Sequence, residues 1–438
     1  MVDKIFELIE KEKQRQQNSL MMIPSENYTY PEVLEAVGSI LMQKYAEGYP
    51  GRRYYQGNEI VDEIEELARN RALKAFNLDP EKFHANVQAH SGSEANLGVY
   101  NALLSAGDKI MSMYLPDGGH LSHGWRMGDK KTTFVSKMFE VEFYKVNPET
   151  RLFDYEQIEK QALVFRPKLI ISGGTAYPRE IDYKRMAEIA SKVGAYYLAD
   201  VAHEAGLIAA GVCQSPFEYA DIVTMTTHKT LRGPRGAIII CKKELGQQLD
   251  MAIMPGLQGG PHLHSIAGIA VALEKTKTDE FLNYAKQTVK NAQKLSEILI
   301  KGGLDVVSLG TDKHLIVVDL RNKEQSGWFT AWAMEKAGII MNRNTVPNET
   351  ASPFYPSGIR LGTPALTVRG MKDGEMEQIG KWILEVIDIV GKQSVSAEAE
   401  ERKVDLKKFM GEIDGNQRLK EIKQMVEELC GRFPIYER

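Results

Sequence analysis

Two kinds of apolar pattern alternate along the chain from about residue 60 onward. Stretches such as VDEIEELARNRALKAF (61–76) place apolar residues three and four positions apart, which predicts amphipathic helices. Between such stretches lie short runs rich in β-branched residues: KLIISG (168–173), AYYLAD (195–200), DIVTMTT (221–227) and AIIIC (237–241). Runs of this kind are typical of buried strands. Their alternation with helices predicts an α/β fold, with a mostly parallel sheet sandwiched by helices.

Breaks in this pattern divide the chain into an arm and two domains. A helical stretch fills most of residues 1–30 and is broken by Pro24 and SENYTYPEV, so this segment is predicted to be an N-terminal arm. Residues 31–275 are expected to form a large domain around the sheet. Residues 276–438 contain DVVSLG, HLIVVDL and GIRLGTPA between helical stretches, which predicts a smaller α+β C-terminal domain.

Composition and charge exclude several classes of protein. The net charge is −4 with both signs dispersed, and the charge run near residue 400 predicts a solvated helix, so neither nucleic acid nor a membrane is expected as a partner. The three cysteines, Cys213, Cys241 and Cys430, form no C-x-x-C pair, which predicts free thiols in a reducing compartment. The N-terminus lacks the unbroken apolar run of a signal peptide, so we expect a soluble cytoplasmic protein.

Two strand ends carry the residues with the most specific chemistry. Lys229 follows the run DIVTMTT, and Asp200 ends the run AYYLAD with His203 just behind it. Parallel strands end at one edge of their sheet, where open α/β sheets bind ligands. Pyridoxal phosphate needs this pair, because a lysine forms the imine while a carboxylate keeps the ring nitrogen protonated. Taken singly, Lys229 could be a surface lysine and Asp200 a helix cap.

The segment HSGSEAN is a candidate phosphate site. It places Ser91, Gly92 and Ser93 at the start of a predicted helix, where exposed N–H groups and hydroxyls favour an anion. Ser91 and Glu94 also fit an S-x-x-E capping box, which is common at helix starts. The motif therefore indicates phosphate binding mainly in the company of Lys229.

Two further segments combine glycine with histidine. MPGLQGGPH could be a plain turn between helices, or its Gly259 and Gly260 could let the backbone approach a phosphate. His120 and His123 lie three apart in PDGGHLSHG, but the cysteine and carboxylate company of a zinc site is missing, so no metal is predicted.

Together these motifs resemble serine hydroxymethyltransferase from about residue 24 to about residue 370. They follow the family's order: SENYTYPEV, KYAEGYPGRRYYQGNEIVD, HSGSEAN, PDGGHLSHG, DVAHEAGLIAAG, TTHKTLRGPRG, MPGLQGGPH, DKHLIVVDL and SGIRLGTPA. The resemblance implies the fold of the aspartate-aminotransferase-like pyridoxal-phosphate enzymes (fold type I), usually a homodimer with shared active sites. It also implies pyridoxal 5'-phosphate as cofactor and tetrahydrofolate as co-substrate.

The resemblance assigns cofactor roles to individual residues. Lys229 corresponds to the imine lysine, Asp200 to the partner of the pyridine nitrogen, and His120 to the imidazole stacked on the ring. Thr175 and His203 would face the phenolic oxygen. The implied phosphate contacts are Ser91, Gly92, Ser93, His228 and Tyr45, with Gly259 and Gly260 from the neighbouring chain.

It assigns substrate roles as well. Arg360 would clamp the amino-acid carboxylate with help from Ser25, while Glu47 would be the catalytic acid with Tyr55 as its neighbour. The other implied substrate contacts are Tyr54, Leu115, Gly119, Leu121 and Asn342 for the folate, together with Arg235.

The reaction implied is the reversible transfer of the hydroxymethyl carbon of L-serine to tetrahydrofolate, giving glycine and 5,10-methylenetetrahydrofolate. Two residues depart from the family: Thr175 replaces a common serine but keeps the hydroxyl, and Glu204 stands where an apolar residue is usual. The rivals are an aldolase for 3-hydroxy amino acids and a binding protein that has lost catalysis. Retro-aldol cleavage and direct displacement stay open, as do dimer and tetramer.

Overall fold

The computed structural model describes residues 3–393, 395–396 and 398–436. The chain divides into two compact units. The large unit is Thr29–Lys286, and the small unit combines Met1–Tyr28 with Gln287–Arg438.

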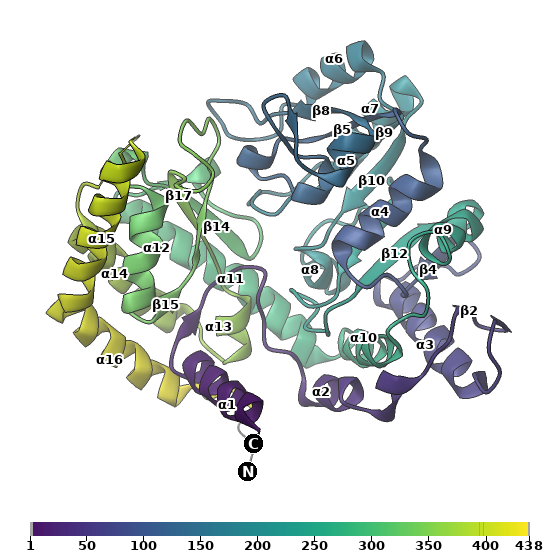
Figure 1. The fold of residues 1–438 in the computed structure, drawn as a ribbon, viewed down its shortest axis with the longest axis horizontal. Coiled ribbons are helices and arrows are strands. Elements are labelled where there is room, and N and C mark those ends of the chain that lie inside the picture. Colours follow the sequence, from purple (N-terminus) through teal and green to yellow (C-terminus); the bar gives the residue numbers. More distant parts are fainter. Residues whose placement is uncertain (1–2, 394, 397, 437–438) are drawn as a thin grey trace. The chain divides into compact units, whose positions relative to one another are not determined.

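The large unit is built on a seven-stranded sheet (Figure 1). In spatial order its strands are β4 (Phe83–Asn86), β12 (Ala237–Lys242), β11 (Ile222–Thr226), β10 (Tyr196–Asp200), β9 (Leu169–Ser172), β5 (Lys109–Met113) and β8 (Glu140–Tyr144). The strands from β11 to β8 pair in parallel, whereas β12 is antiparallel to both of its neighbours. The predicted mostly parallel sheet is therefore confirmed.

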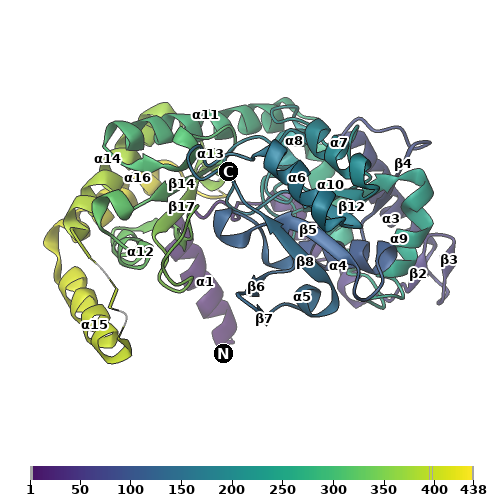
Figure 2. The same cartoon turned by 90° about the horizontal axis from the view of Figure 1, so that it is seen from above.

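Helices cover both faces of this sheet (Figure 2). The helices of the unit are α2 (Pro31–Val37), α3 (Glu59–Ala75), α4 (Gly92–Leu103), α5 (Phe134–Met138), α6 (Tyr155–Phe165), α7 (Tyr183–Val193), α8 (Ala205–Ala209), α9 (Gly246–Ile253) and α10 (Leu263–Lys275). On one face, α4, α5 and α9 share an apolar core with the strands. On the other, α7 packs on β9 and β10, and α6 packs on α7 and β8. Both faces are thus buried, so Tyr197, Leu198 and Ala199 of β10 are all at most 1% exposed and the strands appear as continuous apolar runs.

Short elements connect the larger ones. Two hairpins are formed by β2 (Gly48–Tyr49) with β3 (Arg52–Arg53), and by β6 (Arg126–Met127) with β7 (Lys130–Lys131). The 3-10 helices are η1 (Ile40–Gln43), η2 (Leu115–Asp117), η3 (Leu121–His123), η4 (Lys243–Leu245), η5 (Val307–Leu309) and η6 (Arg321–Lys323).

The small unit has an antiparallel sheet in the order β13 (Asp305–Val306), β14 (Leu315–Asp319), β17 (Gly358–Gly362), β16 (Asn342–Asn344). Its helices are α1 (Lys4–Gln17), α12 (Gly327–Lys336), α13 (Pro364–Val368), α14 (Asp373–Val390), α15 (Ala399–Gly415) and α16 (Gln417–Arg432), with α11 (Asp279–Lys301) crossing the boundary between the units. Helix α15 covers the charge run and buries only Phe409 and Ile413. The smaller α+β part of the predicted fold is confirmed.

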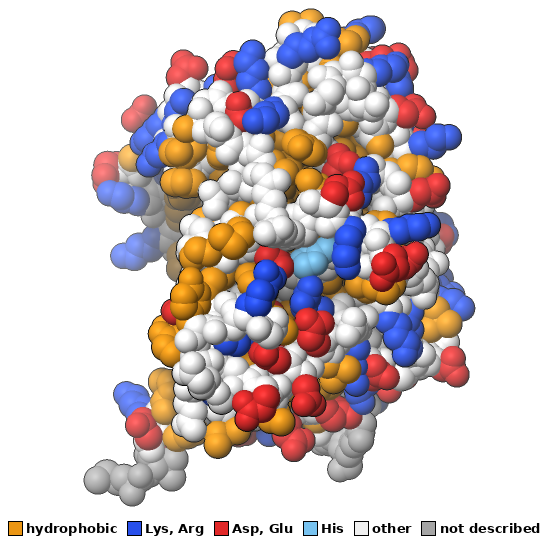
Figure 3. Space-filling model, turned by 90° about the vertical axis from the view of Figure 1, so that its right-hand side faces the viewer, with side chains coloured by type: hydrophobic (Ala, Val, Ile, Leu, Met, Phe, Trp, Pro, Cys, Tyr) orange, Lys and Arg blue, Asp and Glu red, His pale blue; other side chains and the backbone are white. Residues whose placement is uncertain are grey.

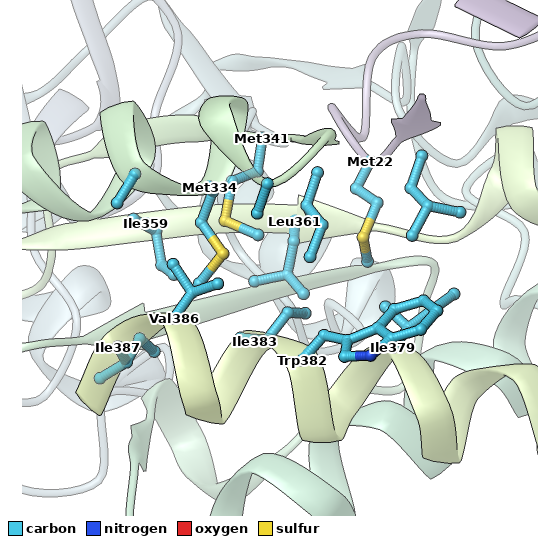
Figure 4. Close-up of a cluster of buried hydrophobic side chains, with 14 of the residues drawn as sticks. Met22, Met334, Met341, Ile359, Leu361, Ile379, Trp382, Ile383, Val386 and Ile387 are labelled. Atoms are coloured by element: carbon cyan, nitrogen blue, oxygen red, sulfur yellow. The ribbon is translucent and has the colours of Figure 1, made fainter. Parts of the chain in front are cut away.

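The N-terminal segment belongs to the core of the small unit. Strand β1 (Leu20–Met21) pairs in parallel with β15 (Ile339–Ile340). Met22 lies in the same apolar cluster as Leu361 and Trp382 (Figure 4). The buried guanidinium of Arg369 donates hydrogen bonds to carbonyls on both sides of this region, including those of Ser19 and Cys430. Contacts between segments so distant in sequence make residues 3–28 an integral part of this unit.

Candidate active site

The carboxyl edge of the parallel strands brings Lys229 and Asp200 to the same side of the sheet. Asp200 is the last residue of β10, and β11, its parallel neighbour, ends three residues before Lys229. Both side chains belong to buried residues, with exposed fractions of 8% for Asp200 and 9% for Lys229. The loop after β9 also reaches this edge, because a Cβ on Gly173 would lie 1.9 Å from the carbonyl oxygen of Asp200. Three strand ends therefore build one site.

The Asp200 carboxylate is held by two side chains and by one backbone N–H group two residues further along the chain. Its Oδ2 accepts hydrogen bonds from His123 Nε2 at 2.9 Å and from Asn96 Nδ2 at 2.8 Å, while Oδ1 accepts from Ala202 N at 3.0 Å. Burial by itself would raise the pKa of Asp200, but the hydrogen bond from His123, the nearby imidazoles and Asn96 together lower it below its usual value. The carboxylate is therefore ionised at neutral pH and fixed in direction.

A second layer of hydrogen bonds orients these partners. Asn96, on α4, accepts from Thr224 Oγ1 at 2.7 Å and donates to Ser122 Oγ at 2.9 Å as well as to Asp200. Ser122 Oγ lies 2.8 Å from His120 Nδ1. A continuous polar chain thus runs from the Asp200 carboxylate to the His120 imidazole, and such networks restrict the orientation of each member.

The loops that carry His203 and Lys229 are joined by Thr230. The Thr230 hydroxyl donates to the His203 carbonyl at 2.8 Å and accepts from Gly206 N at 3.0 Å. The His203 imidazole in turn meets the expected Thr175, with 3.1 Å between Nε2 and Oγ1. The structure therefore brings Thr175, His203 and the Lys229 loop together at one edge.

The start of α4 has the features of an anion site. Ser91 is the N-cap and accepts from Glu94 N at 3.3 Å, which is one half of the expected capping box, but Glu94 Oε2 accepts from His90 N at 2.9 Å and not from Ser91 N. A Cβ on Gly92 would lie 2.5 Å from Thr226 Cγ2, which shows that this helix start abuts the end of β11. Ser91 and Ser93 are exposed there, so their hydroxyls are accessible.

Three basic side chains, those of His228, Lys229 and Arg235, follow strand β11, whose end abuts this helix start. The pKa of His228 is lowered to about 3, first by burial and then by the positive charges of Lys229 and Arg235. His228 Nδ1 is buried and makes no hydrogen bond within the described part of the chain. An anion would offset the repulsion among these groups and could supply the missing partner.

A second group of expected residues lies together on the surface of the large unit. A Cβ on Gly259 would lie 2.9 Å from Glu47 Oε1, and one on Gly260 would lie 3.2 Å from the Tyr45 ring. The Tyr45 and Tyr55 rings meet edge to face with centroids 5.7 Å apart. The pKa of Tyr55 is raised, chiefly by the charge of Glu47. Glu47, its tyrosine neighbours and the glycine pair thus form one cluster.

The folate contacts expected in the large unit lie in two regions of the chain. Tyr54 is 72% exposed beside the cluster around Glu47. Leu115 lies on η2 and Leu121, 53% exposed, lies on η3. Gly119 joins these two short helices, and a Cβ there would lie 2.4 Å from the Met113 carbonyl oxygen, so only glycine fits.

The expected carboxylate contacts belong to the small unit. Arg360 lies on β17 opposite Asn342 of β16, and its Nε donates to Asn342 Oδ1 at 3.0 Å. Burial lowers the pKa of Arg360 to about 10, so the guanidinium still carries its charge at neutral pH. Ser25 follows a segment that packs on the same strand, because Gly362 N donates to the Met22 carbonyl. Arg360, Asn342 and Ser25 are therefore parts of one unit.

Several residues of the site were missed by sequence reasoning. Asn96 and Ser122 carried no distinct signal beyond their place in HSGSEAN and PDGGHLSHG, and His123 was weighed only as a metal ligand. An asparagine on the buried face of a helix was the one available hint, since buried polar side chains are usually hydrogen-bonded. Glu204, the departure from the family, is buried and accepts from Tyr183 Oη at 3.3 Å.

Among the residues that the structure describes, no group of three or more histidine, cysteine, aspartate or glutamate side chains is arranged to hold a metal ion. Over the same residues, no helix has both the length and the apolar character that crossing a bilayer requires.

The fold and the site together define the class of enzyme. A mostly parallel sheet between two layers of helices, a lysine and a carboxylate at its carboxyl edge, and a smaller α+β unit are the architecture of the fold type I enzymes. The family model of serine hydroxymethyltransferase matches residues 1–383. A serine hydroxymethyltransferase of Caenorhabditis briggsae is 45% identical over 446 residues, covering 98% of this chain and 87% of that relative. The chain belongs to the serine hydroxymethyltransferase family and is an enzyme of that class, which confirms the resemblance of the motifs.

Proposed function

We propose that this enzyme transfers the hydroxymethyl carbon of L-serine reversibly to tetrahydrofolate, giving glycine and 5,10-methylenetetrahydrofolate, with pyridoxal 5'-phosphate at the Lys229 edge. The observation that carries the proposal is the Asp200 carboxylate, fixed by hydrogen bonds from His123 and Asn96 at the sheet edge from which Lys229 extends. Membership in the serine hydroxymethyltransferase family supports the choice of substrates.

The residues at this edge fit pyridoxal phosphate. Lys229 would link covalently to its aldehyde, Asp200 would pair with the ring nitrogen, and His120 would lie against the ring. Thr175 and His203 would meet the phenolic oxygen. The phosphate would be bound by Ser91, Gly92, Ser93 and His228, a set that offers the helix start of α4 and the buried Nδ1 of His228. When bound, the cofactor accepts the electron pair left when a bond to the substrate α-carbon breaks.

Arg360 is the proposed anchor of the amino-acid carboxylate. A buried guanidinium favours an anionic ligand, because pairing offsets the cost of keeping its charge out of water. Asn342 fixes Nε and with it the plane of the guanidinium. Arg360 and Ser25 would hold the substrate α-carbon in one orientation, and Arg235 adds positive charge beside His228.

Glu47 is the proposed proton-transfer group, next to Tyr55. It would handle the proton at the serine hydroxyl or the folate nitrogen, a role worth typically ~10² to 10⁴ in rate. The remaining folate contacts proposed are Tyr54, Leu115, Gly119, Leu121 and Asn342.

We further propose a homodimer in which Tyr45, Glu47, Gly259 and Gly260 complete the partner's site. These residues lie together in one chain, so they can enter a neighbouring site as a group. Figure 3 shows apolar side chains exposed over this side of the molecule. Ile40, Met42, Tyr45, Ile60 and Met251 are each at least 57% exposed. Large exposed apolar side chains of this kind are suited to an interface between chains.

The cellular compartment proposed is the cytoplasm. All three cysteines are buried free thiols, which fits a reducing environment.

The deciding experiment follows glycine formation from labelled serine with and without tetrahydrofolate. Transfer predicts label in the folate product and glycine formation that depends on tetrahydrofolate. Equal cleavage of serine or of another 3-hydroxy amino acid without folate would instead identify an aldolase, and no cleavage with any cofactor loading would identify a binding protein.

A further inference from the structure

The hairpin that follows Glu47 is too short to keep its position by its own hydrogen bonds. The Glu47 carbonyl accepts from Tyr54 N at 3.0 Å, and Gly48 pairs with Arg53 across strands of two residues each. Gly48 has φ of +99°, and a Cβ there would lie 2.3 Å from the Arg52 carbonyl oxygen. A two-stranded hairpin this short is marginal by itself in water, so its position depends on other contacts.

The side chain of Arg53 makes those contacts on both sides of Glu47. Its Nη1 donates to the Ala46 carbonyl at 2.9 Å and to the Gly48 carbonyl at 2.8 Å. These are the carbonyls of the residues immediately before and after Glu47. One guanidinium nitrogen therefore holds the peptide group before Glu47 and the carbonyl of the residue after it, while the Glu47 carbonyl between them is held by Tyr54 N.

Two carboxylates on α3 hold the guanidinium from the other side. Arg53 Nε donates to Asp62 Oδ1 at 2.8 Å, and Nη2 donates to Glu65 Oε2 at 2.7 Å. The side chains of Arg53 and Glu65 are 3% and 1% exposed, so this ion pair is buried. Asp62 also accepts from Gly51 N at 2.8 Å, which ties the hairpin turn to the same helix.

Gln88 closes the network. Its Nε2 donates to Glu65 Oε1 at 2.7 Å and to the Gly48 carbonyl at 3.0 Å. Burial raises the pKa of Glu65, and the charge and hydrogen bonds of Arg53, with that of Gln88, oppose the rise. A buried ion pair often contributes little net stability compared with an apolar replacement. The buried network of Arg53, Glu65 and Gln88 therefore serves mainly to fix the position of the hairpin.

We infer that Arg53 is a positioning residue for the transfer reaction, which sets the direction of Glu47 by binding the carbonyls on either side of it. The inference rests on the proposed role of Glu47. Lysine cannot replace Arg53, because a single ammonium group lacks the planar set of donors that reaches two carbonyls and two carboxylates together. Arg53 acts through Glu47 and does not itself meet the substrate.

The test compares neighbouring arginines in the full-length enzyme loaded with pyridoxal phosphate. Arg53→Lys is expected to lower kcat for tetrahydrofolate-dependent serine cleavage at least about tenfold, since small errors in the placement of a reacting group are costly. The KM for serine, the bound cofactor and the absorbance change on adding serine should stay within about twofold. Arg52→Lys, at an exposed position, is the matched control and should match wild type throughout.

A double variant separates positioning from general damage. If Arg53 acts through Glu47, then Arg53→Lys should cause no further loss in a Glu47→Gln background, because the group that it positions is already disabled. Multiplicative losses would overturn the inference, as would an Arg53→Lys enzyme as fast as Arg52→Lys. Should Arg53→Lys fail to fold, Asp62→Asn decides: a folded variant with lowered kcat supports the inference, and one with wild-type kcat overturns it. Full turnover by Glu47→Gln would instead refute the proposed role of Glu47.

Discussion

Lys229 is the residue on which the proposed chemistry depends most directly. Replacing it with alanine removes the amine that would link to pyridoxal phosphate, so Lys229→Ala should lose turnover essentially completely, a fall of at least about 10³. Lys242→Ala, which removes a partly exposed lysine paired with Asp221 at 2.6 Å, is the control and should keep wild-type turnover. Borohydride reduction followed by peptide mapping should place the cofactor on Lys229. Label on another lysine would refute this assignment.

His228 should make the cofactor-free protein sensitive to acid. Its pKa in the folded chain is about 3, against 6.5 for the ordinary side chain, so between these values only the unfolded state binds the proton. Stability therefore rises with pH through this window and is lost as pH falls below about 6.5. The loss from pH 7.5 to pH 5 should be about 2 kcal/mol for this one group.

His228→Asn tests this directly, because asparagine cannot take up the proton. Urea unfolding of the cofactor-free chain at pH 7.5 and pH 5 should show a pH-dependent loss smaller by about 2 kcal/mol in the variant than in wild type. Identical losses in the two proteins would mean that His228 is not held neutral in the folded state.

At the scale of elements, the strand ends at the site were predictable and the contacts between them were not. The runs around Asp200 and Lys229 became β10 and β11, since strands buried on both faces carry a continuous apolar signal. Strand β12 has an equally apolar sequence, AIIIC, yet pairs antiparallel, and no local pattern records direction. The pairing of β1 with β15 joins residues more than 300 positions apart, which helical periodicity cannot anticipate.

The same division holds for the polar groups of the site. Family motifs indicated Asp200 and His120, because each sits in a stretch of diagnostic sequence, whereas Thr175 lies in GGTAYPRE, which follows the family only loosely. The link from Asp200 through Asn96 to Thr224 joins β10, α4 and β11, so it exists only once the sheet has formed. Arg53 likewise reads as one of two arginines in GRRYYQG until α3 supplies Asp62 and Glu65.

The contact between α4 and β11 gives a prediction at this scale. In Gly92→Ala the new methyl group would meet Thr226 Cγ2 at 2.5 Å, so the helix start must shift. We expect a stability loss of about 1–3 kcal/mol and at least about tenfold weaker binding of pyridoxal phosphate, measured by absorbance titration. Gly411→Ala, on α15 in open space, is the control and should lose neither.

Rescue distinguishes this clash from a general effect of alanine. Adding Thr226→Ser removes the methyl group that Gly92→Ala meets, while the hydroxyl that donates to the Ala202 carbonyl at 3.1 Å is kept. The double variant should regain most of the lost cofactor affinity. If it binds no better than Gly92→Ala alone, the packing of α4 on β11 is not what sets the phosphate site.

For the whole molecule, the proposed dimer predicts that two inactive chains can restore activity together. Lys229→Ala damages a chain's own cofactor site, whereas Glu47→Gln damages the group that the chain would lend to its partner. A mixed dimer then contains one site with both defects and one intact site, because two-fold symmetry makes the exchange reciprocal. Random mixing yields parental and mixed dimers as one to two to one, so about a quarter of wild-type activity should return.

The measurement is tetrahydrofolate-dependent glycine formation after the chains are unfolded and refolded together, with each variant refolded alone as the control. Mixed dimers verified by differential tags that stay inactive, or activity in a monomeric fraction, would refute the shared site. Glu47 would then have to serve the Lys229 of its own chain.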